Sequence, residues 1–106
     1  MLVVTTPMLD GIRITQYRGA IFAQVVRGFA IGQGFFDSFR AIGGDRSKGH
    51  EELIQHIRFE ALEELKREAA NAGGNAIVGA VIDVEAVSLR ERPMLLAKAY
   101  GTAVVI

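Results

Sequence analysis

Hydrophobic and polar positions divide the chain into several short apolar segments and one long amphipathic segment. Residues 2–5 are mostly β-branched and predict a short strand. Residues 12–18 alternate between apolar and polar side chains, which is typical of a half-buried strand. Residues 20–26 follow Gly19 and are almost continuously apolar, so they predict a strand that is covered on both faces.

The clearest predicted element is a helix over residues 50–72. Apolar side chains recur at every fourth position, and charged side chains occupy the opposite face. The apolar positions are Leu53, Ile57, Ala61, Leu65 and Ala69. The pair Gly73-Gly74 is a typical C-terminal stop for such a helix. A shorter helix is predicted to end near Ile42, because Phe35, Phe36 and Phe39 precede it at helical spacing.

Two further strands complete the predicted order. Residues 75–87 begin with an apolar run, and residues 94–105 follow a charged turn. A length of 106 residues fits one domain, so residues 1–106 are expected to form a single unit. The predicted fold class is α+β, in the order βββ-α-α-ββ, with a mostly antiparallel sheet and one long helix.

Phe59 does not fit the pattern of the long helix. It lies about 200° around the helix from Ile57, beside the charged face. Either another copy of the chain covers this aromatic side chain, or a neighbouring loop of the same chain does.

The apolar content predicts an interface between copies. Half of the residues are hydrophobic, 50%, and the mean hydropathy is +0.26. A domain of this size buries only about two-thirds of its unfolded surface. A tightly packed monomeric core is the alternative. The predicted interface residues are Ile21, Phe22, Val25, Phe59, Ile77 and Val81.

Charge and cysteine content exclude several classes of function. Lys plus Arg and Asp plus Glu are 12 each, which disfavours nucleic acid and anionic membranes as partners. The absence of cysteine excludes disulfides, thiol nucleophiles and thiolate metal sites. We expect a cytoplasmic protein without an export signal or a membrane anchor.

Glu52, His56 and Glu60 are the candidate metal ligands. Their spacing of four residues places them on one helix face, where an imidazole between two carboxylates can hold zinc or another divalent ion. The same pattern is also typical of a solvated, ion-paired helix surface. No other cofactor is expected.

Arg46 and Ser47 form a candidate site for a small anion, because they precede the long helix and helix N-termini attract negative charge. Ordinary capping of the helix by Ser47 is the alternative. The chain shows no pairing of a nucleophile with a base, so no catalytic residue is predicted and we expect a non-enzymatic protein.

Motifs along nearly the whole chain resemble the YbjQ-like family, whose members have no established function. These motifs are Thr5-Thr6 with Gly11, Tyr17 with Gly19, Gly44, Arg46-Ser47, Glu51, Ala76-Ile77-Val78-Gly79, Asp83, Glu85, Met94 and Gly101-Thr102-Ala103-Val104. The resemblance implies a dodecin-like α+β subunit that assembles into a ring, commonly a pentamer. It also implies a label of heavy-metal binding.

This sequence departs from the family pattern where polar or charged residues are usual. The departures are at Ala23-Gln24, Ala30, Gln33-Gly34, Ala41 and Val84. Fewer acidic residues mean fewer ligands for hard cations. Either the chain is a divergent natural branch, or it is a re-surfaced scaffold that works with a second protein component.

The leading hypothesis is therefore a non-enzymatic homo-oligomer, a pentamer or a multiple of one, with a structural or ligand-binding role. The chain itself is the expected partner. Binding of a divalent metal or a small anion is the alternative.

Overall fold

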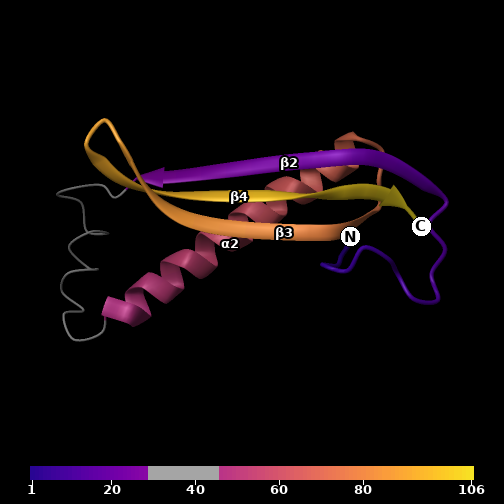
Figure 1. Cartoon of the computed structure of the whole chain (residues 1–106), viewed down its shortest axis with the longest axis horizontal. Coiled ribbons are helices and arrows are strands. Elements are labelled where there is room, and N and C mark those ends of the chain that lie inside the picture. The colour runs from indigo at the N-terminus through magenta and orange to yellow at the C-terminus, as the bar shows by residue number, and fades with distance from the viewer. Residues whose placement is uncertain (29–45) are drawn as a thin grey trace.

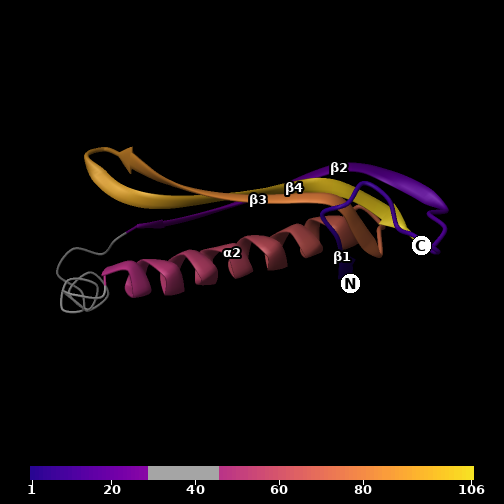
Figure 2. The same ribbon diagram turned by 60° about the horizontal axis from the view of Figure 1, so that its bottom comes forward.

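The computed structural model describes residues 1–28 and 46–106, and it describes side chains in the helix from residue 51 onward. In the described residues, one helix lies against one face of a four-stranded sheet (Figures 1 and 2). The strand order is β1-β3-β4-β2, so β2 forms one edge of the sheet. The elements are β1 (Leu2–Val3), β2 (Gln16–Gly28), α2 (Arg46–Asn71), β3 (Ala76–Leu89) and β4 (Arg92–Val105). The predicted short helix lies outside the described residues.

The sheet is mixed but mostly antiparallel. β2 and β3 both pair with β4 in antiparallel fashion, and only the two-residue β1 pairs in parallel, with β3. The predicted α+β class, with strands following the long helix, is therefore confirmed in its coarse form.

β2 corrects the prediction of two separate strands over residues 12–18 and 20–26. The structure has one strand of 13 residues, Gln16–Gly28, and residues 12–15 are not in a strand. Gly19 has a φ of +106° and lies at a register shift between Tyr17 and Gly19. The glycine therefore forms a bulge within a continuous strand, where its backbone freedom is needed, and does not end the strand.

Contrary to the prediction, the described residues cover only one face of β2 around Phe22. Ile21, Ala23 and Val25 are buried against α2, whereas Phe22 is 70% exposed. Successive side chains of a strand point to opposite faces, so only one side of this apolar run meets the core.

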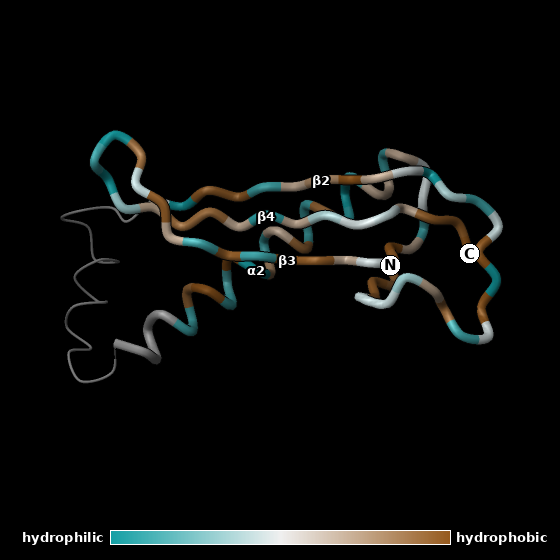
Figure 3. Tube along the Cα trace, viewed as in Figure 1, coloured by the Kyte–Doolittle hydropathy of each residue, from teal (hydrophilic) through white to brown (hydrophobic). Residues whose placement is uncertain are grey.

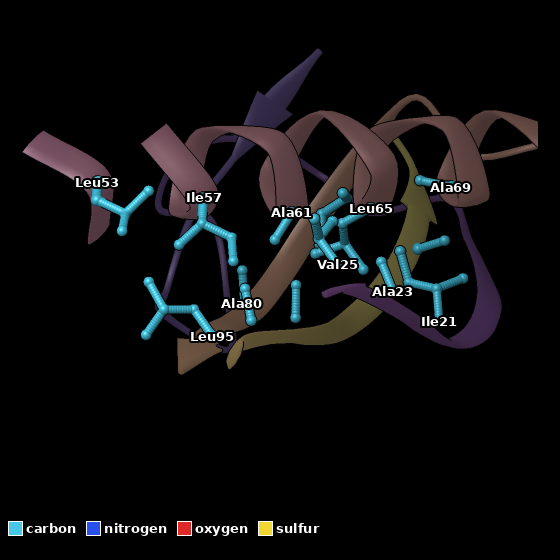
Figure 4. Close-up of a cluster of buried hydrophobic side chains, with 14 residues drawn as sticks. Ile21, Ala23, Val25, Leu53, Ile57, Ala61, Leu65, Ala69, Ala80 and Leu95 are labelled. Carbon is cyan, nitrogen blue, oxygen red and sulfur yellow. The ribbon is translucent and has the colours of Figure 1, made fainter. Parts of the chain in front are cut away.

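The core lies between α2 and the sheet. The five predicted apolar positions of the helix, Leu53, Ile57, Ala61, Leu65 and Ala69, are all buried. Figure 4 shows them directed towards the sheet residues Ile21, Ala23, Val25, Ala80 and Leu95. The recurrence of apolar residues at every fourth position predicted this face correctly, because residues four apart lie above one another on a helix.

Small residues line the inner face of β4 from Ala97 to Ala103, which lets the helix lie close to this part of the central strand. Ala97, Ala99 and Ala103 are buried there, and Gly101 continues the row. A β carbon at Gly101 would lie 2.8 Å from the Ile77 Cγ2 atom and 3.2 Å from the Val78 carbonyl oxygen. The space next to Gly101 is therefore already occupied.

Gly101→Ala is expected to lower the free energy of unfolding by about 1–3 kcal/mol, because the added methyl group overpacks the core. Gly28→Ala is the matched control, since a β carbon there would make ordinary contacts with the Met94 side chain, at 3.5 Å from Cε and 4.0 Å from Cγ. Chemical denaturation of both variants measures the difference. Equal stability of the two variants would contradict this packing.

The helix α2 ends next to Gly73-Gly74, as this glycine pair predicts. Gly73 has a φ of +87°, and the Gly74 amide donates a hydrogen bond to the Ala69 carbonyl oxygen at 2.8 Å. The Arg18 Nε atom from β2 donates to the Ala72 carbonyl oxygen at 2.8 Å. A cationic side chain at this end also offsets the partial negative charge of the helix C-terminus.

The N-terminal segment covers one end of the opposite sheet face. Val4, Leu9 and Ile14 pack against Val78 and Val104 in a second, smaller cluster. The backbone holds this segment in place, because the Val4 amide donates to the Ile77 carbonyl oxygen at 2.9 Å. Beyond this end, none of the described elements lies over that face in Figure 2.

The β3–β4 hairpin ends in a charged tip, which is hydrophilic in Figure 3. Arg90 and Glu91 both have positive φ values, 52° and 64°. This is the conformation of a type I′ turn, which glycine and asparagine adopt at a lower cost. The tip is therefore a strained turn that the long strand pairing holds in place.

Candidate functional site

The sheet face opposite α2 carries cross-strand rows of exposed side chains, and we call it the open sheet face. Tyr100 on β4 pairs with Phe22 on β2 and with Val81 on β3. These side chains are 45%, 70% and 42% exposed, respectively. Side chains of directly paired residues lie on the same face and touch one another. The three residues therefore form one apolar row across the sheet.

A polar row lies beside the apolar row. Lys98 on β4 pairs with Gln24 on β2 and with Asp83 on β3. The Lys98 Nζ atom also lies 3.0 Å from an oxygen of Glu85. The hydrogen bond and the charge of Glu85 raise the pKa of Lys98 above its ordinary value, with a smaller contribution from Asp83. Lys98 is therefore a cation throughout the neutral range.

A hollow of about 390 Å³ lies over β2 and β4 on the open sheet face, lined by Phe22, Ala23, Gln24, Lys98, Ala99 and Tyr100. Its position brings two aromatic rings, one amide and one ammonium group together. The carboxylates of Asp83 and Glu85 belong to β3, on the other side of Lys98. Aromatic and cationic side chains therefore line the hollow, whereas the rest of this face carries apolar, acidic and basic side chains.

A second hollow, of about 310 Å³, lies between α2 and the edge strand β2. Arg27 forms an ion pair with Glu60, and the His56 Nε2 atom lies 2.8 Å from the other carboxylate oxygen of Glu60. Phe59 borders this hollow and remains 60% exposed. The two alternatives for Phe59 remain open, because residues 29–45 are not described.

The structure brings together only two of the three predicted metal ligands. His56 and Glu60 touch, but Glu60 is shared with Arg27, and Glu52 is exposed and forms no ion pair with either residue. Within residues 1–28 and 51–106, whose side chains the structure describes, no group of three His, Asp or Glu side chains is arranged to hold a metal ion. Glu60 acts instead as the centre of an ion-paired helix surface.

The predicted anion site is only partly described. The helix begins at Arg46, so Ser47 lies within the first turn and does not precede it, contrary to the predicted cap. The side chains of Arg46 and Ser47 lie outside the described residues, and the anion site remains a prediction.

The predicted interface residues separate into two groups. Ile21, Val25 and Ile77 are 6%, 9% and 0% exposed and belong to the core of the single chain, which corrects their assignment to an interface. Phe22, Val81 and Phe59 are exposed. Sequence reasoning did not include Tyr100 and Lys98. The alternation of Leu96, Lys98 and Tyr100 along β4 is the signal that marks them as one face.

Within the described residues, no helix has both the length and the apolar composition needed to cross a membrane. Over residues 1–28 and 46–106, the fold is a small two-layer α+β structure in which the N-terminal segment covers one end of the sheet face opposite α2. The sequence model of the YbjQ family, described as "Putative heavy-metal-binding", matches residues 1–106. The chain belongs to this family.

Relatives with the same length support the assignment. The chain is 40% identical to a UPF0145 protein of Actinobacillus pleuropneumoniae serotype 5b, covering 100% of this chain and 99% of the relative. It is 41% identical to a UPF0145 protein of Bifidobacterium longum subsp. infantis, covering 100% and 96%. A crystal structure from Pediococcus pentosaceus, a protein of unknown function in the DUF74 family, matches with a TM-score of 0.66 at 21% identity. This match covers 100% of this chain and 97% of that one, and it shows a shared fold.

Proposed function

We propose that this protein is a non-enzymatic, homo-oligomeric subunit of the cytoplasm that binds a ligand at the boundaries between copies. The observation that carries the proposal is the apolar row of Phe22, Tyr100 and Val81 on the open sheet face. Contiguous exposed apolar side chains mark sites of association in soluble proteins.

The composition of this face supports a protein interface. Aromatic residues are enriched at the centres of interfaces, and a polar rim usually surrounds them. Here Phe22 and Tyr100 lie beside the polar row of Gln24, Lys98 and Asp83. A second copy that lies over this face removes the aromatic side chains from water and leaves polar groups at its margin.

A ring is the form of assembly that we propose. Exposed aromatic residues lie on different surfaces, among them Phe22 and Tyr100 on the open sheet face and Phe59 on α2. Contacts between unlike surfaces of identical chains close into rings when the rotation permits it. The pentamer that the family resemblance implies is one such ring.

Light scattering over a dilution series tests the assembly. The proposal predicts a mass that is a multiple of 11.5 kDa and that persists on dilution. A mass of one chain at all concentrations would show that the open sheet face has no partner copy.

Binding of a divalent metal is the second candidate function, favoured by the contact between His56 and Glu60. Two ligands leave a tetrahedral zinc site incomplete. After dialysis against zinc, metal analysis is expected to find well under one zinc per chain. The matched pair of variants is His56→Ala and His50→Ala. Stoichiometric zinc that only His56→Ala removes would overturn this expectation and establish the metal site.

A further inference from the structure

We infer that the hollow over β2 and β4 binds a small planar aromatic molecule with one negative charge, such as an aromatic carboxylate. The inference deepens the proposed binding role by naming the class of ligand. It rests on that role in one respect, because a neighbouring copy would give the hollow an opposite wall.

The aromatic part of the ligand follows from the strand register. Phe22 and Tyr100 are direct partners across β2 and β4, and both line the hollow. Neighbouring rings on one sheet face provide a flat apolar surface, and aromatic groups prefer offset or edge-on contacts with such rings. A volume of about 390 Å³ admits one small molecule.

The negative charge follows from Lys98. Its ammonium group has three donors, and one of them meets Glu85 at 3.0 Å, which leaves two for a ligand. Gln24, its partner on β2, adds an amide donor on the same side. The carboxylates of Asp83 and Glu85 approach Lys98 from β3 and repel a second negative charge. A ligand with one carboxylate on the β2 side of Lys98 accepts hydrogen bonds from Lys98 and Gln24 and keeps its charge away from the two carboxylates of β3.

Titration of the intact chain with 2-naphthoate, followed by calorimetry, tests the inference. Lys98→Gln is expected to weaken binding about tenfold, because it removes a charge-assisted hydrogen bond. Phe22→Ala is expected to weaken binding about three- to tenfold through loss of an aromatic contact. Glu85→Gln is expected to strengthen binding, because it releases Lys98. Glu91→Gln, at the tip of the β3–β4 hairpin, is the control and is expected to leave the affinity unchanged.

The neutral analogue 2-naphthamide separates charge recognition from adsorption to apolar surface. Equal affinities for the acid and the amide, or an unchanged affinity in Lys98→Gln, would overturn the inference. Native mass spectrometry of the titrated samples separates it from the proposed assembly. A ring without the probe refutes only the ligand site, and a single chain that carries the probe refutes only the assembly.

Discussion

Leu65→Ala is expected to lower the free energy of unfolding by about 3 kcal/mol. Leu65 is the fourth of the five buried positions along α2 and is 0% exposed. Truncation removes the transfer free energy of the lost methyl and methylene groups, and it leaves a cavity that the surrounding residues fill only in part. Urea denaturation at a fixed protein concentration measures the change.

Leu89→Ala is the matched control for Leu65→Ala. Leu89 is 50% exposed at the hairpin, so the same substitution there is expected to cost less than about 1 kcal/mol. A fixed concentration matters because dissociation of an oligomer contributes to its apparent stability. Similar costs for the two variants would mean that α2 does not cover the sheet as described.

Phe22→Glu is expected to abolish the assembly while the chain remains folded. The side chain is 70% exposed in the single chain, so the substitution does not disturb the core. In an assembled interface, the same position would bury a carboxylate without a partner, and several kcal/mol oppose such burial. Size-exclusion chromatography is expected to show the mass of one chain, and circular dichroism is expected to be unchanged.

Two further variants serve as comparisons for Phe22→Glu. Met8→Glu places the same charge at an apolar side chain that is 73% exposed in the N-terminal segment, and it is expected to keep the assembly. Phe59→Glu shows whether the surface of α2 takes part in the interface. An assembly that survives Phe22→Glu would exclude the open sheet face as the essential contact.

The helix and the core under it could be predicted from the sequence because both depend on local periodicity. Apolar residues at every fourth position define one helix face, and that face is buried. They are Leu53, Ile57, Ala61, Leu65 and Ala69. The outward position of Phe59 follows from the same geometry, and the structure confirms its exposure. Such patterns need no knowledge of distant residues.

The continuity of β2 could not be predicted in this way. A glycine at position 19 fits both the end of a strand and a bulge within one, so the residue type does not distinguish the two. The distinction depends on β4, whose residues 102–105 continue the pairing on both sides of Gly19. This partner lies more than eighty positions away in the sequence, so local patterns do not contain the information.

The division of apolar residues between core and open sheet face also depends on long-range pairing. Ile21, Phe22 and Val25 are all apolar, so their sequence does not say which side meets the helix. On β3, a register shift between Val78 and Val81 moves later residues to the other face. The alignment of Val81 with Tyr100 arises only after this shift.

Native mass spectrometry of protein purified without chelators or affinity metal shows whether copies of the chain assemble. It reports the number of copies and any retained ligand in one experiment. We predict a ring, most simply five copies of the 11.5 kDa chain, in which the open sheet face is covered. A chain that remains a monomer under native conditions would contradict this prediction, because the aromatic row on that face would then have no partner copy.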